Sequence, residues 1–112
     1  MSQTIRKILV PTDFSAVAVN ALDHAITLAQ HSEAEVFLLH VVGKQSDVED
    51  ARKQLDAIIG NASSKAGSVR LNKLVRVGSI YEDIGDAAAE IDASLIVMGT
   101  HGMRGMQFLT GS

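Results

Sequence analysis

A glycine-rich segment late in the chain has the residue types and spacing of a phosphate-binding turn. The apolar run at 95–98 leads directly into glycines at 99, 102 and 105, and eight residues then separate Gly102 from Gly111 and Ser112. A buried strand that opens into such a turn, followed by Gly-Ser where a helix can begin, lets backbone N–H groups converge on a phosphate. The segment therefore predicts a nucleotide site, and a flexible surface turn is the alternative interpretation.

Two further side chains in this segment have chemistry that suits a phosphate. His101 is an imidazole within the turn, and Arg104 is its only lysine or arginine. Either can donate a charge-assisted hydrogen bond to a phosphate, and a solvated surface position is the alternative for both. The chain has no nucleophile elbow, no Ser-His-Asp arrangement and no zinc-ligand spacing, so we predict no catalytic residue and no metal site.

The elements that must position this turn follow from the hydrophobic pattern. Continuous apolar runs are typical of strands covered on both faces, and the three segments between them have helical periodicity. The third run alternates polar and apolar residues, which indicates an edge strand. This pattern predicts an α/β fold with a doubly wound parallel sheet and helices on both faces. The four runs lie at residues 7–10, 35–42, 69–77 and 94–98.

In such a sheet, ligands bind beyond the carboxyl ends of the strands, where the winding reverses. Pro11, Thr12 and Asp13 follow the first strand, and Met98 and Gly99 end the fourth. Asp13 has two interpretations. It is either the N-cap of the next helix or, if Ser15 provides that cap, an acceptor for a ligand. Met98 is likewise either core filler or a wall of the site.

Length and composition set the class of protein. The 112 residues suit one domain, 1–112, and the net charge of −3 argues against a nucleic-acid-binding face. The chain has no cysteine, and no stretch approaches the roughly 20 apolar residues of a membrane span. We therefore expect a cytoplasmic protein that binds neither nucleic acid nor membrane.

Three segments together resemble the universal stress protein family. They are Val-Pro-Thr-Asp-Phe-Ser at 10–15, Leu-His-Val-Val at 39–42 and Val-Met-Gly-Thr-His-Gly at 97–102, and the resemblance extends over the whole chain. It implies strand order 3-2-1-4-5 and a homodimer, and in one branch ATP binding. Because the family continues for a further helix and strand, we expect order 3-2-1-4 here, without the family's fifth strand.

The ATP-binding branch is similar to this chain at the glycines, in the pattern Gly-x2-Gly-x9-Gly followed by Ser or Thr. Gly99 and Gly102 match its first pair and Gly111-Ser112 its last, with eight spacer residues in place of nine. By this resemblance Asp13 and Val41 contact the adenine, Pro11 and Thr12 wall the base and ribose, Met98 and Gly99 lie against the ribose, and Gly102, Gly111 and Ser112 hold the phosphates.

The resemblance implies an ATP-binding regulatory protein whose ligand, with or without Mg²⁺, changes the surface offered to an unknown protein partner. We expect slow hydrolysis at most. A family member that binds no nucleotide and acts as a dimerisation and interaction module is the alternative, which the shorter spacer favours. An enzyme of adenylate chemistry on a related fold is a remote alternative, because residues 11–13 lack the Ser-Gly-Gly loop of such enzymes.

Overall fold

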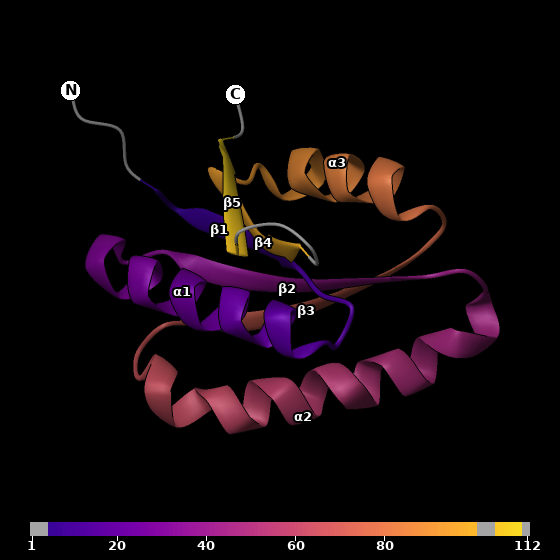
Figure 1. Cartoon of the computed structure of the whole chain (residues 1–112), viewed down its shortest axis with the longest axis horizontal. Helices are drawn as coiled ribbons and strands as arrows, with labels where there is room; N and C mark the ends of the chain where they lie inside the picture. Colours follow the sequence, from indigo (N-terminus) through magenta and orange to yellow (C-terminus); the bar gives the residue numbers. More distant parts are fainter. Residues whose placement is uncertain (1–4, 101–104, 111–112) are drawn as a thin grey trace.

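The computed structural model describes residues 5–100 and 105–110, in which strands and helices alternate as far as the fourth strand (Figure 1). A short 3₁₀ helix, Gln45–Asp47, precedes the second α-helix. The helices are α1 (Ala16–Ser32), α2 (Val48–Ala66) and α3 (Ile80–Ile91). The strands are β1 (Lys7–Pro11), β2 (Glu35–Val42), β3 (Leu71–Val77), β4 (Leu95–Thr100) and β5 (Gly105–Thr110).

The strands form one sheet in the order β3-β2-β1-β4-β5. β1 pairs in parallel with both β2 and β4, and β2 pairs in parallel with β3. The predicted order 3-2-1-4 of the parallel strands is confirmed, and so is the position of β3 at an edge. The winding reverses at β1, because the chain goes on to β2 on one side and returns to β4 on the other.

Helices cover both faces of the sheet, as predicted (Figure 1). α1 and α2 lie on one face over a core that includes Ile8, Val36 and Leu55, and α3 lies on the other face with Leu9 and Leu39 beneath it. Ile8 and Leu9 are neighbours in β1 and both are fully buried, because successive strand side chains point to opposite faces. The continuous apolar runs therefore reflect burial on both sides of the sheet.

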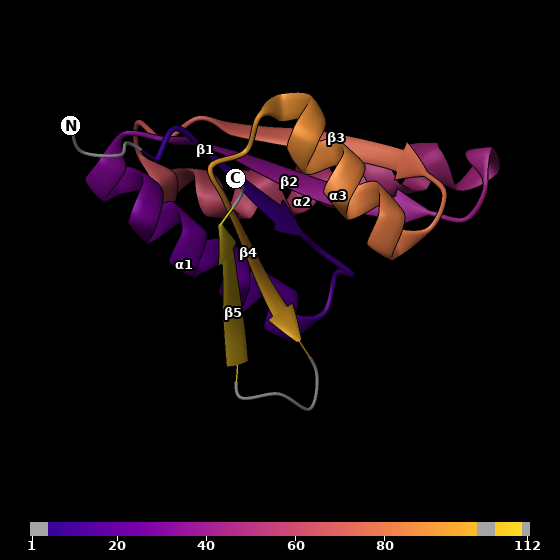
Figure 2. The same cartoon turned by 90° about the horizontal axis from the view of Figure 1, so that it is seen from above.

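The fifth strand was not predicted. β5 runs antiparallel to β4, so that Thr100 pairs with Gly105 and Leu95 pairs with Thr110 (Figure 2). We expected the sheet to end at β4, with residues 103–110 as the spacer between the phosphate-binding glycines. That expectation is wrong for 105–110, which form a strand that leaves the carboxyl edge and runs back along β4.

The start of α3 is fixed by a small polar cluster at the end of β3. Asp83 accepts a hydrogen bond from the Ser79 amide (2.9 Å) and another from Arg76 Nε (3.0 Å), and Glu90 accepts from a terminal nitrogen of Arg76 (2.7 Å). The hydrogen bond to Asp83, followed by that to Glu90, raises the pKa of Arg76. The Asp83 carboxylate lies where a Cβ on Gly78 would have to sit, so that position requires glycine.

Candidate functional site

The turn between β1 and α1 lies at the carboxyl edge of the sheet and is held by short-range hydrogen bonds. The Thr12 amide donates to the Leu39 carbonyl of β2 (2.8 Å), which extends the β1–β2 pairing by one residue. The Phe14 amide donates to Thr12 Oγ1 (3.1 Å), and the Ser15 amide donates to Asp13 Oδ1 (3.0 Å). Each residue of the turn therefore has a defined backbone position beside β2.

The structure settles which residue caps α1. Ser15 is the N-cap, and its Oγ accepts a hydrogen bond from the Ala18 amide (3.2 Å). Asp13 lies two residues earlier, where its exposed side chain closes a tight turn onto the Ser15 amide. The capping interpretation of Asp13 is therefore wrong, and its carboxylate is presented at the carboxyl edge of the sheet.

Five of the predicted site residues line one crevice where the winding reverses, between the ends of β1 and β4. The crevice has a volume of about 70 Å³. Ligand sites for drug-sized molecules usually measure about 300 Å³ or more, so this crevice can enclose only part of a nucleotide. Its lining includes Ala18 of α1 and Ile84 of α3, which the sequence analysis did not identify. The predicted residues there are Pro11, Thr12, Asp13, Met98 and Gly99.

Gly99 has a structural role in this crevice that is independent of any ligand. A Cβ placed on Gly99 would lie 2.6 Å from the Val17 carbonyl oxygen and 2.5 Å from Val17 Cγ1. Contacts this short do not occur between real atoms, so β4 approaches the first turn of α1 closely only because residue 99 lacks a side chain. The glycine that the sequence assigned to a ribose contact is also required for packing.

Val41 does not line this crevice, although it packs against the same core cluster as Met98. It lines a neighbouring pocket of about 330 Å³ between the end of β2 and the start of α2. His40 and Phe14 also line this pocket, and neither was predicted as a site residue. Their side chains pack together, with ring centroids 4.1 Å apart. Both residues belong to segments that carry the family resemblance, but no sequence pattern indicates their contact, because it joins residues from two separate elements. The remaining lining residues are Val42, Gly43, Asp47, Asp50, Ala51 and Gln54.

The other predicted residues, His101, Gly102, Arg104, Gly111 and Ser112, lie outside the described residues. Thr110 pairs with Leu95, at the amino end of β4, whereas Gly105 pairs with Thr100 at the carboxyl end. The two pairs are five residue steps apart along the strand, which corresponds to about 17 Å.

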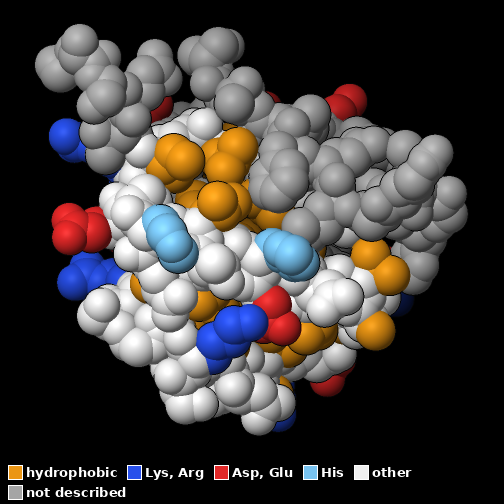
Figure 3. All heavy atoms as spheres, turned by 60° about the vertical axis from the view of Figure 1, so that its left-hand side comes forward, with side chains coloured by type: hydrophobic (Ala, Val, Ile, Leu, Met, Phe, Trp, Pro, Cys, Tyr) orange, Lys and Arg blue, Asp and Glu red, His pale blue; other side chains and the backbone are white. Residues whose placement is uncertain are grey.

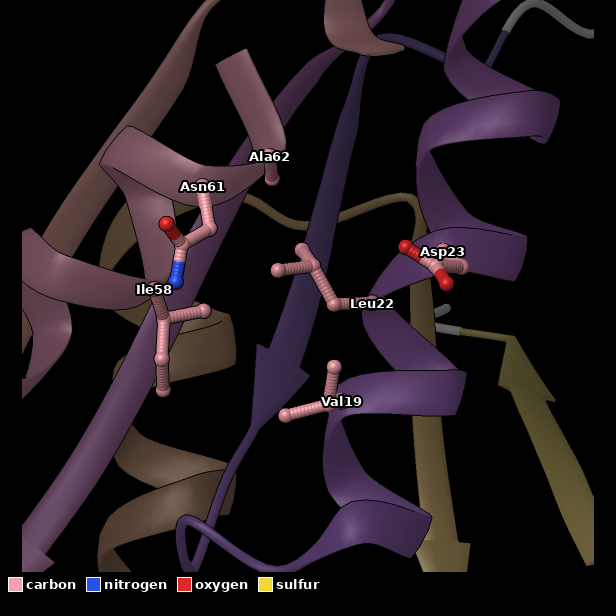
Figure 4. Close-up of a pocket in the computed structure, with 6 residues that line it drawn as sticks. All are labelled: Val19, Leu22, Asp23, Ile58, Asn61 and Ala62. Carbon is pink, nitrogen blue, oxygen red and sulfur yellow. The ribbon is translucent and has the colours of Figure 1, made fainter. Parts of the chain in front are cut away.

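A depression of about 150 Å³ lies between α1 and α2, where Val19 and Leu22 face Ile58 across the gap (Figure 4). Its other lining residues are Asp23, Asn61 and Ala62. On the face in Figure 3, basic and acidic side chains lie next to one another and do not form a patch of one sign.

Within residues 5–100 and 105–110, no group of three or more His, Cys, Asp or Glu side chains could hold a metal ion. The same part of the chain contains no helix that is both long and apolar enough to cross a membrane. Within the described residues, the crevice between β1 and β4 and the pocket beside it are the two that contain predicted site residues.

The parallel sheet, the reversal of winding at β1 and the crevice at that point define a doubly wound α/β protein of the kind that binds ligands at the edge of its sheet. The model of the universal stress protein family matches residues 4–112. The chain belongs to this family.

Individual relatives agree with this assignment. The universal stress protein MJ0531 of Methanocaldococcus jannaschii is 30% identical, over 96% of this chain and 72% of its own length. A crystal structure from this family from Burkholderia pseudomallei has 32% identity and a TM-score of 0.73, covering 90% of this chain and 86% of its own. The structure of the universal stress protein from Archaeoglobus fulgidus in complex with dAMP has 27% identity and a TM-score of 0.73. The match covers 87% of this chain and 82% of that chain.

Proposed function

We propose that this protein binds an adenine nucleotide in the crevice between β1 and β4 and responds by changing the surface that it offers to a protein partner. The observation that carries the proposal is the convergence of Pro11, Thr12, Asp13, Met98 and Gly99 where the winding reverses. A family relative with the same fold is in complex with dAMP, which supports an adenine nucleotide as the ligand class.

In this proposal the ligand is ATP, with or without Mg²⁺. Asp13 accepts a hydrogen bond from the exocyclic amine of the adenine, and Val41 contacts the same base. Pro11 and Thr12 wall the base and ribose, and Met98 and Gly99 lie against the ribose. The phosphates lie with Gly102, Gly111 and Ser112, where His101 and Arg104 are also close in sequence. The proposal assigns no catalytic residue and expects slow ATP hydrolysis at most, so the protein acts as a nucleotide-linked regulator.

The position of β5 adds a conformational step. Thr110 is paired at the amino end of β4, and Gly111 is covalently attached to it. In this proposal Gly102 and Gly111 bind one triphosphate, and β5 separates from β4 when they do. A ligand that binds only the separated form shifts the population toward it, which changes this edge of the molecule. This step links nucleotide binding to the surface available for a homodimer or another protein partner.

The direct test is to identify what the purified protein carries and binds. The purified protein is denatured and the precipitate is removed, and any released nucleotide is identified by chromatography and mass spectrometry. A separate sample is then titrated with ATP in a calorimeter. We expect ATP to be released or bound. Protein that is empty and also fails to bind ATP would contradict the proposal and favour the interaction module. Conversion of ATP to AMP would favour the adenylate enzyme.

A single substitution tests the glycine turn. We expect Gly102→Val to weaken ATP binding at least a hundredfold while thermal unfolding stays cooperative, because the β-branched side chain blocks close approach of a phosphate to the backbone. Gly60→Val makes the same chemical change at an exposed position on α2 where a Cβ has open space, and should bind ATP normally. Equal ATP affinity in the two variants would show that the glycine turn is not part of the site.

The interaction module remains a second candidate because one observation favours it. The pairing of Thr110 with Leu95 holds the chain next to Gly111 away from the carboxyl edge. If this arrangement persists in the presence of ATP, the protein acts through association with itself or another protein. Sedimentation with and without ATP distinguishes the candidates, since only the nucleotide-linked regulator should change its association state with ligand.

A further inference from the structure

His40 makes a specific hydrogen bond to the turn that carries Asp13. Its Nδ1 lies 2.7 Å from the backbone carbonyl oxygen of Thr12. A carbonyl oxygen can only accept, so Nδ1 must carry the proton, and in the neutral ring Nε2 is then unprotonated. The bond therefore fixes the tautomer of His40 and ties β2 to a residue twenty-eight positions earlier in the chain.

The His40 ring also packs against Phe14, the residue that follows Asp13. The Phe14 ring lies against His40 with 4.1 Å between ring centroids and 37° between ring planes. Phe14 has φ of 68°, in the left-handed region. A bulky residue in this region is strained and persists only where its surroundings impose it. His40 thus contacts both neighbours of Asp13, one by a hydrogen bond and one by packing.

His40 acts on the turn from the face opposite α3. Leu39 belongs to the core under α3, whereas Leu38 belongs to the core under α1 and α2. Because strand side chains alternate, His40 lies on the α1 and α2 face, and it lines the pocket there rather than the crevice between β1 and β4. Its effect on a ligand in the crevice must therefore pass through the backbone of the turn.

The backbone of Thr12 is held on both sides by consecutive residues of β2. Its amide donates to the Leu39 carbonyl (2.8 Å), and its carbonyl accepts from His40 (2.7 Å). The first bond is ordinary strand pairing, and the second replaces the pairing that stops where the chain turns away. The hydrogen bond from His40 is thus the contact that fixes the peptide leading into Asp13.

We propose that His40 is the positioning residue of this site. Its Nδ1–H sets the orientation of the peptide between Thr12 and Asp13, and thereby the direction in which the Asp13 carboxylate meets an adenine amine. The part of the proposal that concerns adenine rests on the proposed function, whereas the fixing of the turn does not.

Two variants separate the hydrogen bond from the packing. His40→Asn keeps an N–H donor near the place of Nδ1 but removes the ring. His40→Phe keeps a ring against Phe14 but has no donor. We expect His40→Phe to bind ATP about tenfold more weakly, the effect of one hydrogen bond, and His40→Asn to stay within about threefold of the original protein. Thermal unfolding of each variant checks that it folds.

A merely structural role predicts a different pattern, in which affinity follows thermal stability and the variant that loses the ring suffers most. Equal ATP affinity in His40→Phe and the original protein would also overturn the proposal. Because the expected loss depends on the donor and not on the ring, the pair of variants distinguishes a positioning residue from a packing residue.

A second measurement needs no nucleotide. In the ligand-free protein, ¹⁵N NMR should show the proton of neutral His40 on Nδ1. Hydrogen exchange of the Phe14 and Ser15 amides should be about tenfold faster in His40→Phe than in His40→Asn. A proton on Nε2, or equal exchange in the two variants, would overturn the fixing of the turn. If these results hold but the original protein binds no ATP, the proposed function fails while the role of His40 in the turn stands.

Discussion

At the scale of single residues, the crevice depends on groups that serve the fold and the site together. Gly99 lines the crevice and also lets β4 pass close to Val17. Thr12 lines the crevice while its backbone joins β1 to β2 and its hydroxyl accepts from the Phe14 amide. Because these residues have two roles, loss of ligand binding in a variant does not by itself assign a ligand contact, and stability has to be measured alongside it.

Gly99 provides a test at this scale. We expect Gly99→Ala to lower the free energy of unfolding by about 1–3 kcal/mol, because the new methyl group meets the Val17 backbone, which cannot move as a flexible side chain would. Urea unfolding measures the change. Gly43→Ala is the control, since a Cβ there meets nothing within 4 Å, and it should unfold as the original protein does. Equal stability of both variants would contradict the close approach of β4 to α1.

At the scale of elements, α3 is joined to β3 by charges rather than by an N-cap side chain. Ser79 occupies the N-cap position of α3 without a side-chain capping bond, and Asp83, one turn into the helix, accepts its amide hydrogen. Arg76 reaches the same carboxylate from β3. This arrangement fixes the helix that contributes Ile84 to the crevice.

We expect Asp83→Ala to destabilise the protein by about 1–3 kcal/mol, because it removes two hydrogen bonds and leaves the Arg76 charge without its less exposed partner. Glu90→Ala removes the other partner of Arg76. Because the Glu90 side chain is 66% exposed, this substitution should lower the free energy of unfolding by less than about 0.5 kcal/mol. Chemical denaturation of both variants measures the difference. Similar losses would contradict the assignment of the helix anchor to Asp83.

At the scale of the whole molecule, the sheet has a parallel part that carries the crevice and an antiparallel strand at its edge. β5 covers the edge of β4 that would otherwise expose unpaired backbone groups. The proposed function requires this strand to move, so the edge of the sheet and the nucleotide site are coupled. Coupling of this kind turns ligand binding into a change of the surface available to a partner.

A reversible cross-link tests this coupling. The chain has no cysteine, and Leu95 and Thr110 are paired across β4 and β5, so cysteines at both positions can form a disulfide that locks the pairing. We expect the oxidised double variant to bind ATP at least tenfold more weakly than the same protein after reduction, as measured by calorimetry. Each single-cysteine variant serves as control. Undiminished binding in the oxidised protein would show that β5 need not separate.

The parallel part of the fold and the position of the crevice could be predicted from the amino-acid pattern alone. Continuous apolar runs are a direct consequence of burial on both faces, and the residues that follow them must gather at one edge because the strands are parallel. Pro11, Thr12, Asp13, Met98 and Gly99 were therefore predictable as neighbours from their places in the chain. The order of the parallel strands, in contrast, came from the resemblance to the family.

Three further features are evident only in the folded molecule. It assigned the cap of α1 to Ser15, because Ser and Asp have similar capping strength and only geometry separates them. It brought His40 to Thr12 and Phe14, a contact between elements that leaves no periodic trace in the sequence. It also paired β5 with β4, because a glycine-containing segment takes its conformation from the edge that it meets rather than from local preference.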